Sequence, residues 1–321
     1  MTLTSPPVPA PPIVGDEPVL MISEVVKSYG EVQALRGVDL DIAPGEVVAL
    51  LGPNGSGKTT LMTIIAGLLA PDSGVLALDG EPLTQHRPRK QRIAIGYSGQ
   101  RIALYPGLTV EENLRHLGAL SGPQARDARI GPVVAMLQLQ PLLHRRADAL
   151  SGGQARRVHV ALAALGSPRL VILDEPSAGV DAESRAILTA AVRTLADDGV
   201  AVLYSTHYPQ EVEELDPRIA FLHHGRMVAD GTLGELLVGR GVQVRVHFAG
   251  HPVIPAAWEG RAQIRGQAVL LSMDEHVVDP LRLLSDLDPQ ERLRVRHLST
   301  QPPSLRQLYA ELVGMEDDDA G

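Results

Sequence analysis

A glycine-rich turn lies between a strand pattern and a helix pattern, and it reads Gly52-Pro53-Asn54-Gly55-Ser56-Gly57-Lys58-Thr59. The apolar run Val47–Leu51 before it is typical of a buried strand. This order of strand, turn and helix satisfies G-x-x-x-x-G-K-[ST], whose backbone amides wrap phosphate oxygens. We therefore predict that Lys58 reaches the β- and γ-phosphates and that the Thr59 hydroxyl ligates Mg²⁺. The helix pattern presents one apolar face, formed by Leu61, Ile64, Ile65 and Leu68.

A second pair of glycines, further along the chain, begins another helix pattern. The stretch reads Leu150-Ser151-Gly152-Gly153-Gln154, and the Ala- and Leu-rich pattern after it ends at Gly166-Ser167-Pro168. Ser151 is placed to cap this helix, and the glycines let backbone N–H groups approach a ligand closely. A helix N-terminus of this kind attracts anions. Because the chain already has one phosphate loop, we expect a nucleotide clamped between two copies.

Two carboxylates follow a third apolar run. The run Leu170–Leu173 is typical of a buried parallel strand and ends in Asp174 and Glu175. Carboxylates are costly to bury without a partner, and Mg²⁺ supplies one for Asp174. Glu175 is then placed to orient or deprotonate the attacking water. Alone, such a pair is more often part of a helix-capping loop, but the phosphate loop upstream favours the metal site.

His207 follows a further strand pattern, Val200–Thr206. Most single histidines are structural or solvated. However, Lys58, Glu175 and His207 each follow the carboxyl end of a strand pattern, which is the edge of an open α/β sheet where ligands bind. We therefore predict that His207 contacts the γ-phosphate, whereas His159 lies in a helix pattern without comparable support.

Composition limits the class of protein. The 321 residues are 44% hydrophobic, and the formal net charge is -9. The sequence has no basic stripe, which argues against a nucleic-acid partner. The absence of cysteine excludes disulfides and thiolate metal sites and fits a reducing compartment. No apolar run approaches the roughly 20 residues that span a bilayer. We expect a soluble protein, or one held at a membrane by a partner.

The chain is expected to have three parts. Residues 1–19 are proline-rich and are predicted to be an extended linker without a targeting signal. Residues 20–237 alternate strand and helix patterns, which indicates an α/β domain. Residues 238–321 are predicted to form a small α+β accessory domain, followed by the charged tail Glu316–Asp319.

The accessory domain shows both periodicities. Strands are predicted at 242–248 and 268–273, and a third where Leu293 and Val295 alternate with arginines. One helix is predicted to begin at Asp279-Pro280, in the order cap then proline. The closing helix is expected to carry Leu305, Leu308, Tyr309 and Leu312 on one face.

As an ordered set, these motifs resemble the ATP-binding subunit of ABC transporters over roughly residues 20 to 235. The resemblance implies a P-loop NTPase fold of the ABC type with a helical subdomain. It also implies roles for three further residues: Tyr29 stacks on adenine, Gln100 touches Mg²⁺ and contacts the membrane partner, and Asp181 is the D-loop aspartate. The reading of Tyr29 as a core aromatic and of Gln100 as a surface residue stays open.

The implied site is as follows. The resemblance implies that the catalytic residues are Lys58, Glu175 and His207. It implies that Mg²⁺ is bound by Thr59, Gln100 and Asp174. ATP contacts are assigned to Tyr29, Gly52, Pro53, Asn54, Gly55, Ser56, Gly57, Lys58, Thr59, Thr60, Gln100, Ser151, Gly152, Gly153, Gln154 and Asp181.

The sequence departs from the family pattern near Gln100. Gly96-Tyr97-Ser98-Gly99 stands where a Leu-Pro pair is more common, so we expect a more flexible loop there. Val180 replaces the commoner leucine, which is a mild change.

The resemblance implies that two such subunits, identical or homologous, close head-to-tail around two ATP molecules and drive a separate transmembrane permease. The chain would then be peripheral, at the cytoplasmic face of the cell membrane. The stretch Tyr105–Leu114 and the tail Pro303–Tyr309 resemble those of drug, lipid and polysaccharide exporters. Export of a hydrophobic or amphiphilic substrate is therefore the leading hypothesis. An importer ATPase and a non-transport regulatory ATPase are the alternatives.

Overall fold

The computed structural model describes residues 17–84, 87–117, 123–166, 168–206, 208–238, 242–273, 280–301 and 304–314. The chain divides into two compact units, Met1–Thr232 and Leu233–Gly321. Across the described ranges, every helix is too short or too polar to cross a membrane.

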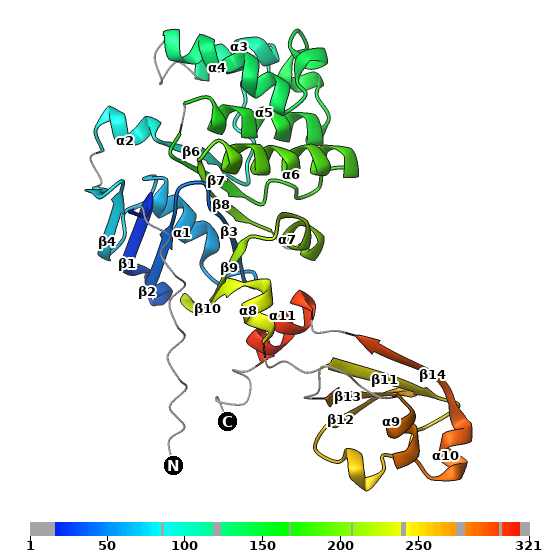
Figure 1. Ribbon diagram of the computed structural model, residues 1–321. Helices are drawn as coiled ribbons and strands as arrows, with labels where there is room; N and C mark the ends of the chain where they lie inside the picture. Colours follow the sequence, from blue (N-terminus) through cyan, green and yellow to red (C-terminus); the bar gives the residue numbers. More distant parts are fainter. Residues whose placement is uncertain are drawn as a thin grey trace. The chain divides into compact units, whose positions relative to one another are not determined.

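A six-stranded sheet forms the centre of the first unit (Figure 1). Its strand order is β10-β9-β3-β8-β7-β6, and all strands are parallel except β10. Both β7 and β8 are buried along their whole length, as continuous apolar runs predict. The bounds are β3 Val47–Leu51, β6 Ile95–Ser98, β7 Leu170–Asp174, β8 Ala201–Ser205, β9 Arg218–His223 and β10 Arg226–Thr232.

A second, antiparallel sheet packs in the same unit, in the order β2-β1-β4-β5. Helix α1, Lys58–Ile65, follows the glycine-rich turn, and its apolar side chains join one core with those of both sheets. This core fixes the position of the turn. The strands of this sheet are β1 Leu20–Tyr29, β2 Val32–Ile42, β4 Ser73–Leu78 and β5 Glu81–Pro82.

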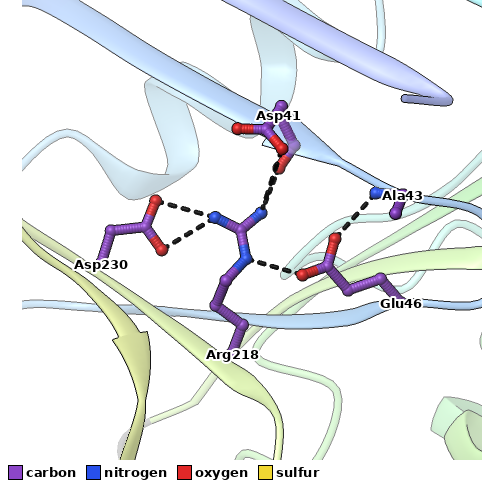
Figure 2. Close-up of polar contacts among 5 residues, drawn as sticks. All are labelled: Asp41, Ala43, Glu46, Arg218 and Asp230. Carbon is purple, nitrogen blue, oxygen red and sulfur yellow. Dashed lines mark hydrogen bonds and ion pairs between the residues drawn. The ribbon is translucent and has the colours of Figure 1, made fainter. Parts of the chain in front are cut away.

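One guanidinium group ties the two sheets together (Figure 2). Arg218 Nε donates to Glu46 Oε1 at 2.6 Å, and Nη1 donates to both carboxylate oxygens of Asp230 at 2.8 Å. Nη2 donates to the backbone carbonyl of Asp41 in β2. Glu46 Oε2 in turn accepts from the Ala43 N–H at 2.7 Å. A buried charge is tolerated when it is fully paired, so this cluster holds the amino ends of β3 and β9 against β2.

Helices form the rest of the first unit. A side chain at Gly96 in β6 would place its Cβ 1.9 Å from the Ala163 carbonyl oxygen, so only glycine allows α5 to pack this closely. Helices α3, α4 and α5 contact one another and form the helical subdomain (Figure 1). The bounds are α2 Arg89–Ile93, α3 Val110–Leu117, α4 Pro123–Met136, α5 Gly152–Ala164, α6 Ala182–Asp197 and α7 Pro209–Leu215, with 3₁₀ turns at Gln140–Leu142 and Ala147–Ala149.

The second unit is built on an antiparallel sheet in the order β12-β13-β11-β14. One face carries the core, in which Val244, Val246 and Phe248 pack with Trp258, Leu283 and Leu287. The elements are α8 Leu233–Leu237, β11 Val242–Phe248, a 3₁₀ turn Ala256–Trp258, β12 Ala262–Arg265, β13 Ala268–Met273, α9 Pro280–Asp286, α10 Pro289–Arg294, β14 Val295–Gln301 and α11 Leu305–Gly314.

The structure corrects the prediction of a strand at residues 292–294. That segment is the end of α10, and β14 begins only at Val295. Asp288 caps α10 by accepting from the N–H groups of Gln290 and Glu291, and Pro289 occupies the first turn. The cap therefore outweighs the short alternation, and Leu293 is 87% exposed.

Two further expectations were incomplete. Leu68 lies beyond the end of α1 and is exposed, so it does not belong to the apolar face of that helix. Strand β12 was not predicted, because the alternation of Ala262 and Ile264 with polar residues is only 4 residues long. The predicted strands at 242–248 and 268–273 are confirmed, as is the closing helix, in which Leu305 and Leu308 are buried.

Candidate functional site

The glycine-rich turn makes a tight loop between β3 and α1. Gly52 has φ 146°, and a Cβ there would lie 2.0 Å from the Leu222 carbonyl oxygen. Gly57 caps α1 with φ 110°, and its Cβ would lie 2.6 Å from the Ala34 carbonyl oxygen. Gly55 has φ 83° but open space around it. Only glycine therefore fits the first and last positions, whereas Gly55 is needed for its backbone conformation alone.

The turn between β9 and β10 braces this loop. The N–H of Gly225 donates to the Ser56 carbonyl at 3.0 Å, and the Gly225 carbonyl accepts from the Arg36 N–H at 2.8 Å. His223 and His224 precede this glycine, and their rings lie 4.3 Å apart. His223 is the last residue of β9 and His224 lies in the turn, so the turn that supports the phosphate loop begins directly after the strand.

Lys58 bends back over the mouth of the loop. Its Nζ donates to the carbonyl oxygens of Gly52 at 2.7 Å and Pro53 at 3.0 Å. Burial lowers the pKa of Lys58, while the charges of Glu175 and Asp174 act in the opposite direction. The ammonium group is thus held at the loop and lies in the field of the two carboxylates.

Asp174 lies at the end of β7, next to the first turn of α1, and is 1% exposed. Its Oδ2 accepts from Thr59 Oγ1 at 2.9 Å, and its Oδ1 accepts from Ser205 Oγ at 2.8 Å. A hydroxyl and a carboxylate side by side are the oxygen ligands that Mg²⁺ prefers, with phosphate and water completing its shell. Thr59 and Asp174 therefore fit such an ion.

Glu175 follows directly with φ 50°, in the left-handed region that few residues other than glycine adopt. Its N–H donates to Ser205 Oγ at 2.9 Å, so the same hydroxyl holds both carboxylate residues. Such backbone strain is maintained by its surroundings and gathers at functional sites. Ser205 was not predicted as a site residue, although a serine that ends an apolar strand next to this edge was a usable signal.

The predicted His207 lies outside the described residues. On either side of it, Thr206 Oγ1 donates to Glu211 Oε2 at 2.6 Å, and the Tyr208 N–H donates to Thr206 Oγ1 at 3.0 Å. The Arg185 guanidinium lies 4.3 Å from the centroid of the Tyr208 ring. Both neighbours of position 207 are therefore anchored to α6 and α7.

The second glycine pair begins α5, and the predicted cap is confirmed. Ser151 Oγ accepts from the Gln154 N–H at 3.2 Å, and Gln154 Oε1 accepts from the Ser151 N–H at 3.1 Å. The two glycines differ in their surroundings. A Cβ at Gly152 would meet no atom within 4 Å, whereas one at Gly153 would lie 2.5 Å from Ser184 Oγ. Gly153 therefore serves close packing, and Gly152 is the glycine that leaves the helix end open.

Asp181 caps the next helix, α6, beside this point. It accepts from the Ser184 N–H at 2.8 Å and from Ser184 Oγ at 3.1 Å, and these bonds lower the pKa of Asp181. A Cβ at Gly153 would lie 2.7 Å from Asp181 Oδ2. The start of α5 and the cap of α6 are thus packed as one piece.

Arg156 contacts the backbone of the segment around Gln100. Arg156 in α5 donates through Nη1 to the Gly99 carbonyl at 2.8 Å and through Nη2 to the Gln100 carbonyl at 2.7 Å. Ser98 is buried, and its Oγ lies 3.0 Å from His159 Nδ1. The greater flexibility expected from Ser98-Gly99 stays a prediction, and the Gln100 side chain is exposed.

His159 forms the other half of this contact and is 6% exposed. Burial, reinforced by the nearby charge of Arg156, lowers the pKa of His159 to about 4. The imidazole is therefore neutral at physiological pH and serves as a hydrogen-bonding core residue. Arg156 was not predicted, because nothing in the sequence marks one arginine of a pair as a clamp.

Tyr29 ends β1 and is 52% exposed, which excludes the alternative that it is a core aromatic. An exposed ring at a strand end can stack on a planar ligand. The described site thus places Lys58, Thr59, Asp174 and Glu175 at one edge of the sheet, whereas Ser151–Gln154 belong to the helical subdomain.

Comparison with known proteins agrees with this geometry. A family model described as ABC transporter matches residues 35–178. The chain is 33% identical over 310 residues to the Nod factor export ATP-binding protein I of Paraburkholderia xenovorans (strain LB400), covering 94% of this chain and 99% of that protein. It is 34% identical over 311 residues to the daunorubicin/doxorubicin resistance ATP-binding protein DrrA of Streptomyces peucetius, and the match covers 92% of this chain and 93% of that protein.

Solved structures cover about two thirds of the chain. One described as the ATP-binding subunit of an ABC transporter covers 68% of this chain and 91% of its own, with a TM-score of 0.62 and 30% identity. A dimeric ATP-binding cassette in a post-hydrolysis state, bound to ADP and Pi, covers 67% of this chain and 98% of its own. The TM-score is 0.59 and the identity is 30%.

Proposed function

We propose a paired mechanism of ATP hydrolysis for this chain, which belongs to the family of ABC transporter ATP-binding proteins. The chain is an exporter-type ATPase subunit, since its relatives are named for Nod factor export and for resistance to daunorubicin and linearmycin. The proposal concerns which residues carry the chemistry and how many subunits complete a site.

Within one subunit, the loop Gly52–Thr60 holds the phosphates and Tyr29 stacks on the adenine. Lys58 turns from the loop carbonyls to the β- and γ-phosphates, and Thr59 and Asp174 hold Mg²⁺, which neutralises phosphate charge when bound. Glu175 accepts a proton from the attacking water, and the hydrogen bond from the Glu175 N–H to Ser205 Oγ holds this residue in place. His207 and Gln100 complete the γ-phosphate side of the site.

The second half of each site comes from another subunit. Gly152 at the start of α5 faces open space, and the first N–H groups of a helix are free to bind an anion. This one observation carries the proposal, because a capped and open helix end suits the γ-phosphate of a nucleotide bound elsewhere. Closure of two subunits then adds these donors where charge accumulates in hydrolysis, and loss of the γ-phosphate releases them.

The proposed partners are a second ATP-binding subunit and a transmembrane permease at the cytoplasmic face of the membrane. The proposed role of Gln100 is to report the state of the site to the permease, and its exposed side chain and the contacts of Arg156 with its backbone support this role. The relatives' names support export, and we propose a hydrophobic or amphiphilic substrate.

The assignment of the base is tested with Glu175→Gln. We expect ATP binding to be unchanged and turnover to fall by about 100-fold or more, since general-base catalysis contributes on that scale. Glu213→Gln, an exposed carboxylate on α7, is the matched control and should keep wild-type turnover. ATPase rates and nucleotide titrations of both purified variants give the answer. Wild-type turnover in Glu175→Gln would assign the base elsewhere.

A further inference from the structure

The second unit contains a cavity that the nucleotide site does not use. Its volume is about 580 Å³, within the range of small-molecule sites, roughly 300–1,000 Å³. Residues of β11, β12 and β13 line one side, and residues of α11 line the other. The cavity thus lies wholly within Leu233–Gly321.

The sheet register explains which side chains reach the cavity. Arg245 in β11 pairs with Leu270 in β13, and Leu270 pairs with Gln263 in β12. Residues that pair across strands share one face of the sheet, and alternate residues along a strand share it too. Arg265 therefore lies on the same face as Gln263. The opposite face carries the buried core of this unit, including Val244, Val246, Val269 and Leu271.

The lining of the cavity is strongly basic. It includes four arginines and one glutamate, in a chain whose formal net charge is -9. Arg245, Arg265 and Arg306 form no ion pair with any residue that the structure describes. The glutamate, Glu311, accepts from Gln307 Nε2 at 3.0 Å. The fourth arginine, Arg261, donates to the Ala257 carbonyl at 3.0 Å. Among the described residues, four arginines and a single carboxylate, that of Glu311, thus line this cavity.

We infer that this cavity binds an anion that presents phosphate groups, supplied by a free phosphorylated small molecule or by the headgroup of a phospholipid. The planar guanidinium fork donates two parallel hydrogen bonds to phosphate, and several forks in one cavity suit a multiply charged ligand. Gln243, Gln263 and Gln307 add amide donors, while Leu270 and Ala310 offer apolar surface. The inference goes beyond ATP hydrolysis, because these residues belong to the other unit.

One other occupant is available within the chain. The acidic segment Glu316–Asp319 begins five positions after Glu311, which lines the cavity in α11. A tethered acidic segment competes at high effective concentration. The experiment therefore includes a variant that ends at Met315.

The test is a calorimetric titration of the full chain with inositol hexakisphosphate. The pair Arg245→Gln and Arg265→Gln should weaken binding roughly 100-fold, since a hydrogen bond to a charged group contributes about tenfold or more. Arg282→Gln, an exposed arginine of α9 outside the cavity, should change binding less than twofold. All variants should keep their ATP affinity and melting temperature. Equal binding by the wild type and the paired variant would overturn the proposal.

Further arms identify the source of the phosphate. Sedimentation with phosphatidylglycerol–phosphatidylcholine vesicles, compared with pure phosphatidylcholine, detects a headgroup ligand, and binding of the soluble probe alone indicates a free molecule. Exposed Arg306→Gln, at the start of α11, should weaken both in parallel. If the probe binds only to the variant ending at Met315, the cavity belongs to the acidic segment, and the proposal fails.

Discussion

Helices α1 and α5 both begin at glycine-rich turns, but their polar groups are satisfied in different ways. At α1, Lys58 is bonded to the carbonyls of Gly52 and Pro53, and Thr59 is bonded to Asp174. At α5, Ser151 and Gln154 cap each other, and Gly152 faces open space. The first turn is thus integrated into its own subunit, whereas the second offers its donors outward. This difference is what a shared active site requires.

Breaking each turn separately should give the largest contrast. Lys58→Ala should weaken ATP binding about tenfold or more and abolish turnover, because it removes a charged donor to the phosphates. Ser151→Arg should leave ATP binding unchanged and lower turnover by about 100-fold, because loss of one hydrogen-bond donor to the transition state lowers kcat on that scale. Nucleotide titration and steady-state ATPase assays on the two variants measure both effects.

The contrast has a clear contrary outcome. If Ser151→Arg loses ATP affinity as severely as Lys58→Ala, then the start of α5 serves the nucleotide of its own subunit. Circular dichroism and thermal melts of both variants confirm that neither result comes from misfolding.

The two glycines of α5 sharpen the comparison on a smaller scale. Gly153→Ala should lower the free energy of unfolding by about 2–3 kcal/mol, because the added methyl overpacks against Ser184 and disturbs the Asp181 cap. Gly152→Ala should leave stability within about 1 kcal/mol of wild type. Urea unfolding measures both. A Gly152→Ala protein that is as unstable as Gly153→Ala would refute the open environment of that position.

The smallest expected effect concerns the contact between α5 and the Gln100 segment. Because the pKa of His159 is lowered to about 4, this imidazole binds a proton near pH 6.5 in the unfolded chain but only near pH 4 in the folded chain. The contribution of neutral His159 to the free energy of unfolding is fully present above pH 6.5. It decreases as the pH falls from 6.5 to about 4 and is constant below that. Between pH 7 and pH 5, wild type should lose about 2 kcal/mol more than His159→Gln. Urea midpoints that fall in parallel for both proteins would contradict this.

The sequence was sufficient to predict the parts of the site in which spacing dictates conformation. The strand, loop and helix around Gly52–Thr59 follow from a motif with strict backbone needs, and β7 with Asp174 follows from a continuous apolar run. The cap at Ser151 follows from short-range hydrogen-bond chemistry.

Contacts between distant segments were beyond the sequence patterns. Ser205 holds Asp174 and Glu175, and Arg156 clamps the Gln100 backbone across more than fifty positions. No local pattern encodes such a pairing, since it depends on how β8 and α5 pack. At residues 289–294, by contrast, a local signal exists in Asp288-Pro289, but the prediction rested on a short alternation and did not consider that cap.

The most direct test of a shared site is the mass of Glu175→Gln in solution, measured by light scattering with ATP or with ADP. Paired sites predict a dimer of the 34.3 kDa chain with ATP and a monomer with ADP. They also predict a monomer with either nucleotide once Ser151→Arg is added. A Glu175→Gln protein that stays monomeric at saturating ATP, or a dimer that survives Ser151→Arg, would contradict the account.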